Sequence, residues 1–453
     1  MENIFLISRF FFGTILLFVV LYFIRYFIPG ENQRKITYFF ALFASGIGWI
    51  FRNVQSLDIS LPDAIPMVRF SYFPHFSVSN ILFLGAIILF YHSLNAKNGR
   101  FFAFLAGILA FILNFILPFT TLLLYFLIIS LAVISFIGNK TPSRDKNGII
   151  FQIMSLRDNN LKNLLLFFAL SLPSLLFMYY LGTTNPIWKT IEEQNVLPSP
   201  PLIRIITGYG LPLFFGILGL WVLIKKDRLK GLFFSIWIFG AITLSFIPLW
   251  IYPMQKKFLE TAMYVPLAIT ASFGIKGIYD YYKKKNIKFL RFKFINVFIM
   301  LAVPILIGSD IQSWQVFTYL NKTNSTKLYL PLENIEAMKW LKQNTPSDSI
   351  ILASFHNSSV IPYFGNRMVY VGHCPLTIDT NEKLEIAENF YSGKYSLAEA
   401  FDFLKKEKIS YVFYSETEKK SEKEIPLSYF DPENYPFLKN VYRNKNINIY
   451  KIE

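Results

Sequence analysis

Long apolar runs and short polar connections alternate along the first two thirds of the chain, and no such run follows Asp310. Each run has the length and the near absence of charge that a helix needs to cross a hydrocarbon layer about 30 Å thick. The pattern predicts about ten membrane helices, at residues 4–24, 36–51, 77–94, 101–117, 119–137, 163–182, 204–224, 232–250, 261–281 and 294–309. We therefore expect an α-helical polytopic membrane protein whose transmembrane domain occupies residues 1–309.

The remaining residues show shorter patterns, which are typical of a water-soluble domain. Apolar residues at helical spacing predict helices, and short runs of β-branched and aromatic residues predict strands. The predicted helices are Leu332–Asn344, Glu382–Phe390 and Leu397–Lys406, and the predicted strands are Ser349–Ala353, Met368–Val371, Tyr411–Tyr414 and Asn446–Ile452. Residues 310–453 are therefore expected to form one C-terminal α/β domain.

Basic residues are distributed unevenly between the two sets of connections. One set, which holds 20 Lys and Arg residues, consists of Arg25–Lys35, Lys97–Arg100, Lys140–Lys162, Lys225–Lys230 and Lys283–Lys293. The opposite set holds only seven. Because cytoplasmic loops carry the excess of Lys and Arg, the first set is predicted to be cytoplasmic. Both termini then face outward, and the 310–453 domain is predicted to be extracytoplasmic, on the cell (inner) membrane.

The composition narrows the classes of partner and site. The chain is 53% hydrophobic, and its net charge of +16 lies in the membrane part, because the residues from Lys322 onward include 17 basic and 17 acidic ones. A neutral soluble domain argues against nucleic acid as a partner. The single Cys374 excludes an intramolecular disulfide, and four His residues without metal-ligand spacing form no zinc-type cluster. A divalent metal held by carboxylates stays open.

Two lysines lie in an outer connection, against the prevailing distribution of charge. Lys256 and Lys257 stand between two apolar runs, with Tyr252, Pro253 and Glu260 beside them. Two ammonium groups at a membrane surface suit a lipid phosphate or diphosphate, since a leaving phosphate gains charge during a transfer. The alternative is that both side chains anchor the chain among the lipid headgroups. The residues alone favour neither interpretation.

Other polar residues of the outer connections are candidates for the same site. The outer carboxylates are Asp58, Asp63, Glu192, Glu193 and Glu260. A carboxylate could act as general base towards a hydroxyl or hold a divalent ion. No spacing among them is diagnostic, so each has the alternative of a solvated loop residue. His75 has the same alternatives, although its place among aromatic residues where a helix begins favours a ligand contact.

A loop in the soluble domain also collects polar residues. Gly372-His373-Cys374-Pro375 follows a predicted strand and precedes Thr377, Asp379 and Lys383. Loops after strands often bind ligands, so His373, Asp379 and Lys383 are candidates. Cys374 has no catalytic partner by spacing. An N-cap at Asp379 or Thr377 is the structural alternative.

Several motifs recur in an order that is informative as a whole. They are Arg9 at the beginning of an apolar helix, Gly46-Ile47-Gly48-Trp49, Pro74-His75-Phe76, Asn195 with Ser199-Pro200, Gly208-Tyr209-Gly210, Gln255-Lys256-Lys257-Phe258-Leu259-Glu260 before Pro266-Leu267, Trp340-Leu341, and Tyr370-Val371-Gly372-His373 with Thr377, Asp379 and Lys383. Their order resembles that of bacterial members of the GT-C superfamily of polytopic membrane glycosyltransferases. These proteins use polyprenyl-phosphate-linked sugars outside the cytoplasmic membrane. The resemblance covers almost the whole chain, and no single motif carries it.

The resemblance implies transfer of one hexosyl or pentosyl unit from a polyprenyl-phosphate donor to a cell-envelope glycan or glycolipid. The donor phosphate would meet Lys256 and Lys257, where relatives tend to have arginines, so the charge is kept and the bidentate fork is lost. A carboxylate would deprotonate the acceptor hydroxyl, and the soluble domain would cover the cavity or bind the acceptor. The candidates for lining this cavity are His75, Glu192, Glu193, Asn195 and Glu260.

One departure from the superfamily concerns its acidic loop. Members carry their catalytic or metal-associated aspartate in the large outer loop after the first transmembrane helix. Arg9 resembles an arginine near a later helix, so that loop has no counterpart here and no catalytic residue is carried over. We expect a further helix and an acidic outer loop upstream of Met1, which would return the N-terminus to the cytoplasm. A complete chain with an outward N-terminus is the alternative.

Two other functions fit the same pattern. A non-catalytic membrane scaffold or lipid-binding partner would keep the fold without the acidic loop. A lipid-linked-sugar transporter would need buried ionisable residues within its helices. The predicted spans hold few of these, with Lys276 and Asp280 near one helix end, and transport does not require a soluble domain of this size.

Overall fold

The computed structural model describes most of the chain, which divides into two compact units. The described residues are 2–50, 73–94, 96–138, 149–250, 252–285, 307–308, 311–312, 314–315, 318–319, 330–373, 376–419 and 431–453. The first unit comprises residues 1–185 and 196–314. The second comprises residues 186–195 and 315–453, so a short segment between two membrane helices belongs with the C-terminal residues.

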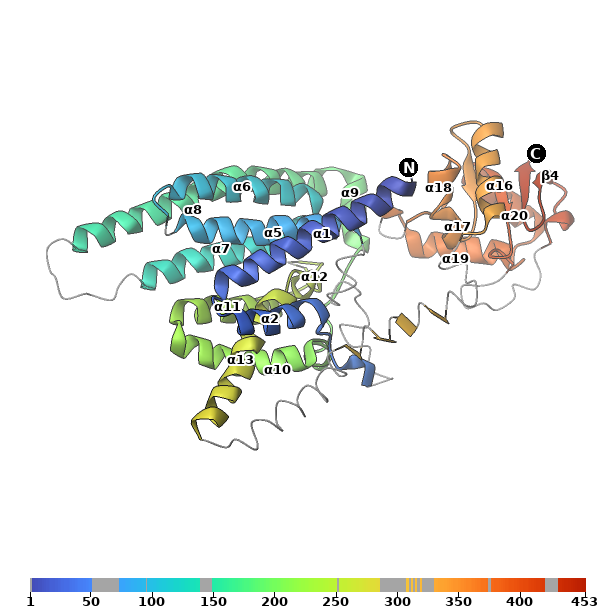
Figure 1. Cartoon of the computed structure of the whole chain (residues 1–453). Coiled ribbons are helices and arrows are strands. Elements are labelled where there is room, and N and C mark those ends of the chain that lie inside the picture. Colours follow the sequence, from blue (N-terminus) through green and yellow to red (C-terminus); the bar gives the residue numbers. More distant parts are fainter. Residues whose placement is uncertain are drawn as a thin grey trace. The chain divides into compact units, whose positions relative to one another are not determined.

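The first unit is a helical bundle, shown in Figure 1. Its elements are α1 (Glu2–Phe27), α2 (Glu31–Phe43), the 3-10 turn η1 (Gly48–Ile50), α5 (Pro74–Ser93), α6 (Gly99–Ile116), α7 (Pro118–Gly138), α8 (Ile149–Thr184), α10 (Leu202–Lys226), α11 (Arg228–Leu244), α12 (Lys257–Glu260) and α13 (Tyr264–Lys284). Among the described residues, α1, α5, α6, α7, α8 and α10 contain six segments that are long and apolar enough to cross a membrane. The chain is therefore a multi-pass membrane protein.

The other predicted spans differ from the observed helices. α2 has 13 residues and ends at Phe43 rather than at residue 51, because Ala44 is already extended. α11 ends at Leu244, shortly before Pro248, whose ring cannot continue a helix. α13 has 21 residues, and its second half carries charged side chains, including Lys276 and Asp280. The predicted helix 294–309 lies almost wholly outside the described residues, so the count of ten remains a prediction.

Small residues allow α10 and α13 to pack closely. A Cβ atom on Gly219 would lie 1.7 Å from the carbonyl oxygen of Thr270, and one on Gly274 would lie 2.2 Å from that of Phe215. Small residues at such contacts let membrane helices approach, where lipid supplies no hydrophobic force between them. The close pair holds the beginning of α10 near the beginning of α13.

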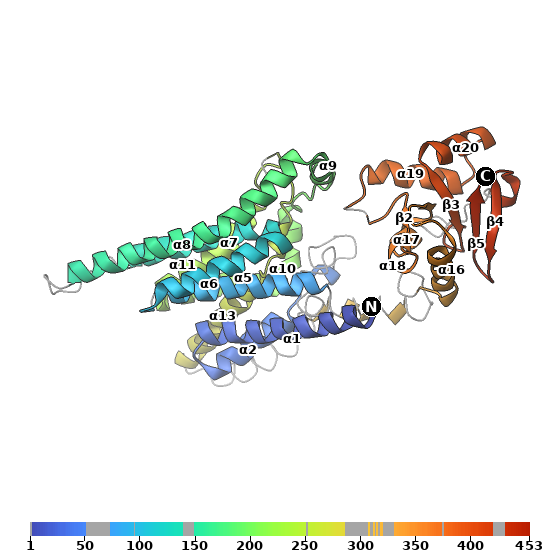
Figure 2. The same cartoon turned by 90° about the horizontal axis from the view of Figure 1, so that it is seen from above.

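Every second connection between the helices lies at the same end of the bundle. Neighbouring helices joined by short connections run antiparallel, as Figure 2 shows for the bundle. The beginnings of α5, α10 and α13 therefore lie at the same end as the turn between α6 and α7. The connection that contains α12 lies there as well.

The second unit contains a five-stranded sheet. Its strands are β1 (Ile350–Leu352), β2 (Met368–Val369), β3 (Ile409–Tyr414), β4 (Leu438–Arg443) and β5 (Asn448–Ile452), in the order β2-β1-β3-β5-β4. β2, β1 and β3 are parallel, whereas β5 is antiparallel to both β3 and β4. The other elements are α9 (Pro186–Gln194), α16 (Leu332–Asn344), α17 (Phe355–Ser358), α18 (Ile361–Phe364), α19 (Thr380–Tyr391), α20 (Leu397–Lys406) and η4 (Pro432–Asn434).

Helices cover both faces of this sheet. Val412 of β3 packs into a core with Phe390 of α19 and Leu404 of α20. Its neighbour Phe413 packs on the opposite face with Met338 of α16. The α/β pattern predicted from the sequence is confirmed, and every predicted helix and strand of this region has an observed counterpart. The edge strand β4 was not predicted, because half of its six side chains are polar and exposed.

Candidate functional site

The connection between α11 and α13 carries several of the predicted site residues. It contains Lys256, the one-turn helix α12 and then Ala262, whose φ is +48°. A non-glycine residue in this left-handed region costs about 1–3 kcal/mol and persists only where its surroundings hold it. The connection is therefore held in a specific conformation by its neighbours.

One of these neighbours is the segment that precedes α10. The Leu197 N–H donates to the carbonyl of Pro253 at 2.8 Å, and the Lys256 N–H donates to the carbonyl of Leu197 at 3.2 Å. The buried Gln255 side chain accepts from the Ser199 N–H at 2.7 Å and donates to the carbonyl of Ile247. The predicted motifs Ser199-Pro200 and Gln255-Lys256-Lys257 thus lie side by side, although more than 50 residues separate them in the sequence.

Two glycine motifs join at the beginning of α10. A Cβ atom on Gly46 would lie 2.2 Å from the carbonyl oxygen of Gly208, and the Ile47 N–H donates to the carbonyl of Thr207 at 2.8 Å. Only a residue without a side chain permits this backbone approach. Glycine is therefore needed at position 46 for packing against α10.

α10 in turn contacts α12. Gly210 has a φ of +46° and kinks α10, a conformation that favours glycine. The neighbouring Tyr209 hydroxyl donates to the carbonyl of Leu259 at 2.5 Å. Three of the predicted motifs are therefore linked in one chain of contacts that ends on α12.

α12 contains an ion pair whose carboxylate is buried and whose ammonium is partly buried. The Lys257 ammonium lies 2.5 Å from the Glu260 carboxylate, and the two side chains are 17% and 6% exposed. The same ammonium lies 5.6 Å from the centre of the Phe76 ring, at the beginning of α5. This is cation–π distance, so the Pro74-His75-Phe76 motif also reaches α12.

Glu260 lines two small hollows at this end of the bundle. The first, which we call the Tyr209 hollow, is lined by Phe40, Ser45, Tyr209, Glu260 and Tyr264, among others. The second, the Asn80 hollow, is lined by Phe76, Asn80, Thr120, Lys257, Glu260 and Thr261, among others. Each hollow has a volume of about 20 Å³, room for about one water molecule, and combines aromatic and hydrogen-bonding side chains around one carboxylate.

Lys256 has a different environment from Lys257. Its side chain is half-buried, and burial lowers the pKa of its ammonium, while the charge of Glu260 raises it and that of Lys257 lowers it. Burial also raises the pKa of Tyr252, and the charge of Glu260 adds to this shift. The Tyr252 hydroxyl therefore stays protonated, and it donates to the carbonyl of Phe119 at 3.1 Å. The described part of the chain gives Lys256 no ion pair, and desolvation of an unpaired ammonium is costly, so an anion beside Lys256 would be stabilising.

His75 lies in the first turn of α5 and is exposed. Its ring is 5.6 Å from that of Phe73 and 4.3 Å from that of Phe76. The structure therefore places His75 beside Phe76 in an aromatic cluster, and His75 does not line either hollow.

The remaining outer candidates belong to the second unit. Glu192 and Glu193 are exposed on α9, and Glu193 lies 3.9 Å from Lys189. The Asn195 amide donates to the carbonyl of Ile191 at 2.7 Å, at the end of the same helix. These three residues thus belong to the second unit, whereas Glu260 belongs to the first.

α9 is attached to the loop that contains the predicted soluble-domain site. The Gln194 side chain accepts from the Asp379 N–H at 3.0 Å and donates to the carbonyl of Thr377 at 2.5 Å. Asp379 has a φ of +55° and stands at the N-cap of α19, but its side chain makes no capping bond. Gln194 was not among the predicted site residues, because nothing in its local pattern signals a partner so distant in the sequence.

The other two soluble-domain candidates lie near the same loop. His373 is exposed, and its carbonyl accepts from the Thr377 hydroxyl at 3.2 Å. The Lys383 ammonium lies 5.5 Å from the centre of the Tyr370 ring. His373, Asp379 and Lys383 therefore lie in the segment that follows β2, and their role in a binding site remains a prediction.

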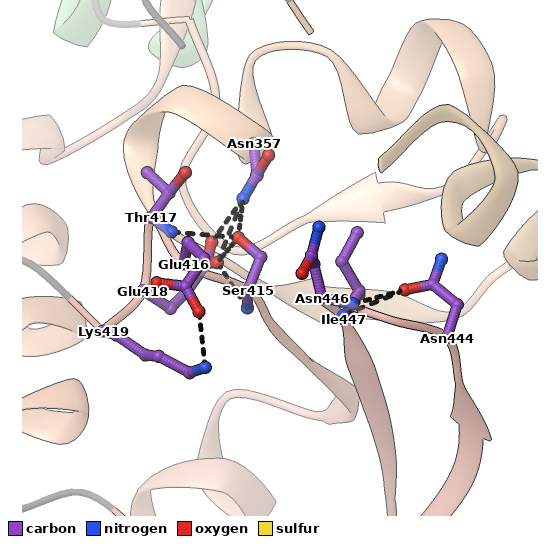
Figure 3. Close-up of polar contacts among 9 residues, drawn as sticks. All are labelled: Asn357, Ser415, Glu416, Thr417, Glu418, Lys419, Asn444, Asn446 and Ile447. Carbon is purple, nitrogen blue, oxygen red and sulfur yellow. Dashed lines mark hydrogen bonds and ion pairs between the residues drawn. The ribbon is translucent and has the colours of Figure 1, made fainter. Parts of the chain in front are cut away.

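A second polar cluster of this unit was also missed. Glu418 is 1% exposed and lies after β3, where its carboxylate accepts hydrogen bonds from Ser354, Asn357 and Ser415, as Figure 3 shows in part. Ser354 and Asn357 follow β1, so the cluster lies at the carboxyl edge of two parallel strands. This edge commonly carries ligands. Here the carboxylate is already surrounded by donors of its own chain, which indicates a structural role.

Metal ligands are not grouped in the part of the chain that the structure describes. No set of three or more His, Cys, Asp and Glu residues there has the geometry to hold an ion. Asp58, Asp63 and Cys374 lie outside the described residues. A divalent metal held by carboxylates, which the sequence left open, therefore stays open.

Comparisons with known proteins concern the fold. No family model and no curated protein sequence matches the chain. Among solved structures, the arabinofuranosyltransferase AftD from Mycobacteria is similar at a TM-score of 0.50 with 12% identity, over 97% of this chain and 33% of that one. The oligosaccharyltransferase of Archaeoglobus fulgidus in the apo form is similar at a TM-score of 0.49 with 12% identity, over 89% of this chain and 57% of that one.

The same archaeal protein, AglB, in complex with an inhibitory peptide and a dolichol-phosphate, gives the same identity, coverage and TM-score. The chain thus spans a third of the length of AftD and little more than half of the archaeal protein. The resemblance predicted from the order of the motifs is confirmed at the level of the fold, which this chain shares with part of AftD.

Proposed function

We propose that the chain is a membrane glycosyltransferase, or part of one, that takes a sugar from a polyprenyl-phosphate donor. The observation that carries the proposal is that Phe76, Ser199 and Tyr209, from three separate segments, all contact the Gln255–Glu260 motif. The architecture shared with an arabinofuranosyltransferase supports it. Because the chain spans a third of AftD, the activity of the whole protein is part of the proposal.

The donor phosphate lies at the end of the bundle that carries α12. Lys256 is the ammonium best suited to it, since it is half-buried and its pKa is lowered by burial, while Lys257 is already paired with Glu260. A phosphate would supply the counter-charge that offsets desolvation of Lys256. The fixed ammonium stabilises the phosphate as its charge develops, which lowers the barrier of the transfer.

The transfer itself exchanges one bond at the sugar. The acceptor hydroxyl forms a bond to C1, the C1–O bond to the phosphate breaks, and the hydroxyl proton passes to a base. The leaving phosphate remains on the lipid beside Lys256. We assign no base among the described residues.

The soluble domain is proposed to face outward and to bind the acceptor, a cell-envelope glycan or glycolipid. The prevalence of Lys and Arg in the opposite connections supports this orientation. The loop with His373, Asp379 and Lys383, to which α9 is attached, is the surface that would contact the acceptor. Protease added outside sealed right-side-out vesicles should therefore cut the soluble domain.

Transfer by the full chain tests the proposal. The chain in proteoliposomes receives a polyprenyl-phosphate ester of a radiolabelled hexose or pentose and a glycan acceptor, and labelled product is counted. Lys256→Ala should lower kcat/KM about ten- to hundredfold, the value of one hydrogen bond to a charged group. Lys276→Ala, on the exposed part of α13, is the matched control.

Two results would count against the proposal. Equal transfer by the wild type and by Lys256→Ala would remove the phosphate from this residue. Donor binding without any transfer by the wild type would favour the non-catalytic lipid-binding partner instead.

A further inference from the structure

Basic residues gather where α10 and α13 end, at the opposite end of the bundle from α12. They are Lys225 and Lys226 in the last turn of α10, Arg228 at the beginning of α11, and Lys283, Lys284 and Lys285 where α13 ends. All six residues are exposed. We call these six residues the basic end.

The packing of α10 against α13 brings the lysines of the two helices together. A Cβ atom on Gly277 of α13 would lie 2.8 Å from the Val222 side chain of α10, and one on Gly216 would lie 3.0 Å from the Thr270 hydroxyl. The two helices therefore run in the same direction and end side by side. With a rise of about 1.5 Å per residue, their lysines differ in height along the bundle by less than about 8 Å.

The acidic residues nearby do not neutralise the basic end. Asp227 pairs with Lys230 at 3.0 Å, and Asp280 pairs with Lys276 at 2.7 Å. Neither of these two lysines belongs to the basic end. Among the described residues, no side chain of the basic end forms an ion pair. The six positive charges repel one another and would be stabilised by an anion.

The basic end stands at a surface of the membrane. The segment Leu202–Lys226 is long and apolar enough to cross the membrane, so its last turn leaves the hydrocarbon layer there. The Lys225 ammonium lies 3.5 Å from the centre of the Trp221 ring, and that of Lys285 lies 5.3 Å from the centre of the Tyr281 ring. The two aromatic residues are 63% and 56% exposed. Exposed Trp and Tyr rings are typical of the level of the lipid headgroups.

We propose that the basic end binds the headgroups of anionic phospholipids in the leaflet on that side of the membrane. A Lys or Arg residue near an anionic membrane surface strengthens binding about fivefold. The aromatic rings beneath Lys225 and Lys285 favour a lipid over a soluble polyanion, since they place these ammonium groups at the depth of the lipid phosphates. Bound headgroups would offset the repulsion between the lysines and hold the ends of α10 and α13 together. This surface lies away from the proposed donor site and does not depend on it.

Lipid binding to the full chain in detergent tests the proposal. Native mass spectrometry measures the dissociation constants of phosphatidylglycerol and of phosphatidylcholine with the same acyl chains. The wild type should bind the anionic lipid at least about tenfold more tightly. Replacing Lys283, Lys284 and Lys285 together by Gln should weaken binding of phosphatidylglycerol about ten- to hundredfold and leave binding of phosphatidylcholine unchanged.

A matched control variant separates the basic end from the total charge of the chain. Replacing Lys97, Arg100 and Lys162 together by Gln removes as many exposed charges at the same end of the bundle, but outside the basic end. This variant should keep the preference for phosphatidylglycerol. Replacing the three lysines of α13 by Arg keeps their charge and should keep the preference as well.

A measurement on the wild type keeps the test independent of folding of the variants. Because salt screens exposed charges, the preference for phosphatidylglycerol should weaken between about 0.05 and 0.5 M salt. Equal affinity of the wild type for both lipids, or a preference that salt does not change, would overturn the proposal. So would an equal loss of phosphatidylglycerol in the two Gln variants, which would indicate an effect of total charge. Displacement of the lipid by heparin, used as a soluble polyanion, at lower concentration than the lipid itself would assign the basic end to a soluble partner instead.

Discussion

The hydrogen bonds that the Glu418 carboxylate accepts from Ser354, Asn357 and Ser415 allow the effect of a substitution on stability to be calculated. One carboxylate oxygen accepts from the Ser354 N–H at 2.9 Å, the Ser354 hydroxyl at 2.6 Å and the Asn357 amide at 2.7 Å. The other accepts from the Ser415 N–H at 2.9 Å, the Ser415 hydroxyl and, at 3.0 Å, the Asn357 amide. Each oxygen therefore faces one backbone N–H, as well as donors that can rotate.

Glu418→Gln should lower the stability of this region, because a backbone N–H has a fixed direction and can only donate. Whichever oxygen becomes the NH₂ group, it meets the N–H of Ser354 or Ser415 head-on. The substitution loses at least one hydrogen bond to a charged group, about 1.5–3 kcal/mol, and leaves a buried N–H unsatisfied, about 1–3 kcal/mol. The free energy of opening this region should fall by roughly 3–5 kcal/mol.

Hydrogen exchange of the full chain measures this loss locally. Peptides that contain Ser354 and Ser415 should exchange at least about a hundredfold faster in Glu418→Gln than in the wild type. The matched control is Glu416→Gln, two residues away. Its carboxylate pairs with Lys419 at 2.7 Å on the surface, with side chains 57% and 45% exposed, and such pairs contribute only about 0–1 kcal/mol. Wild-type exchange in Glu418→Gln would refute the reasoning.

Three further predictions concern other parts of the chain. Gly219→Ala should destabilise the bundle by about 1–3 kcal/mol, since its Cβ would overlap a backbone carbonyl of α13. Gly30→Ala should not destabilise it, because the nearest atom to a Cβ at that position is 3.9 Å away. Thermal unfolding in detergent compares the two variants. Gln194→Ala should increase hydrogen exchange in α9, because it removes both bonds to the 377–379 loop, and unchanged exchange would disprove that attachment. Burial lowers the pKa of His356 below its ordinary value of 6.5, although the negative charge of Glu418 opposes this shift. Protonation of His356 therefore favours the unfolded state, and residues 330–453 should lose stability as the pH falls below about 6.5. His356→Asn should abolish this pH dependence of stability, which hydrogen exchange at several pH values measures.

Much of the architecture could be predicted because it depends on local patterns. The six long apolar helices and all the predicted elements of the soluble domain follow from hydrophobic period, length and β-branched runs. α2 and α11 ended earlier than predicted because hydrophobicity continues past the residues at which the backbone leaves the helix. β4 was missed because an edge strand with exposed polar side chains has no alternating pattern.

The site could be predicted only in part, because its geometry depends on long-range contacts. Lys257 and Glu260 are three residues apart, so a helical turn explains their contact, but nothing local indicates that Glu260 is buried. Glu418 stands in a charge-rich stretch that suggests a solvated loop. Its donors Ser354 and Asn357 lie more than 60 residues away in the sequence. Both features became visible only when distant segments were placed together.

The most direct test of the account is a cryo-EM structure of the full chain in nanodiscs that contain a polyprenyl phosphate. The account predicts phosphate density within salt-bridge distance, about 4 Å, of the Lys256 ammonium, with Lys257 still paired to Glu260. Phosphate density at another place, with Lys256 directed towards lipid headgroups, would contradict it.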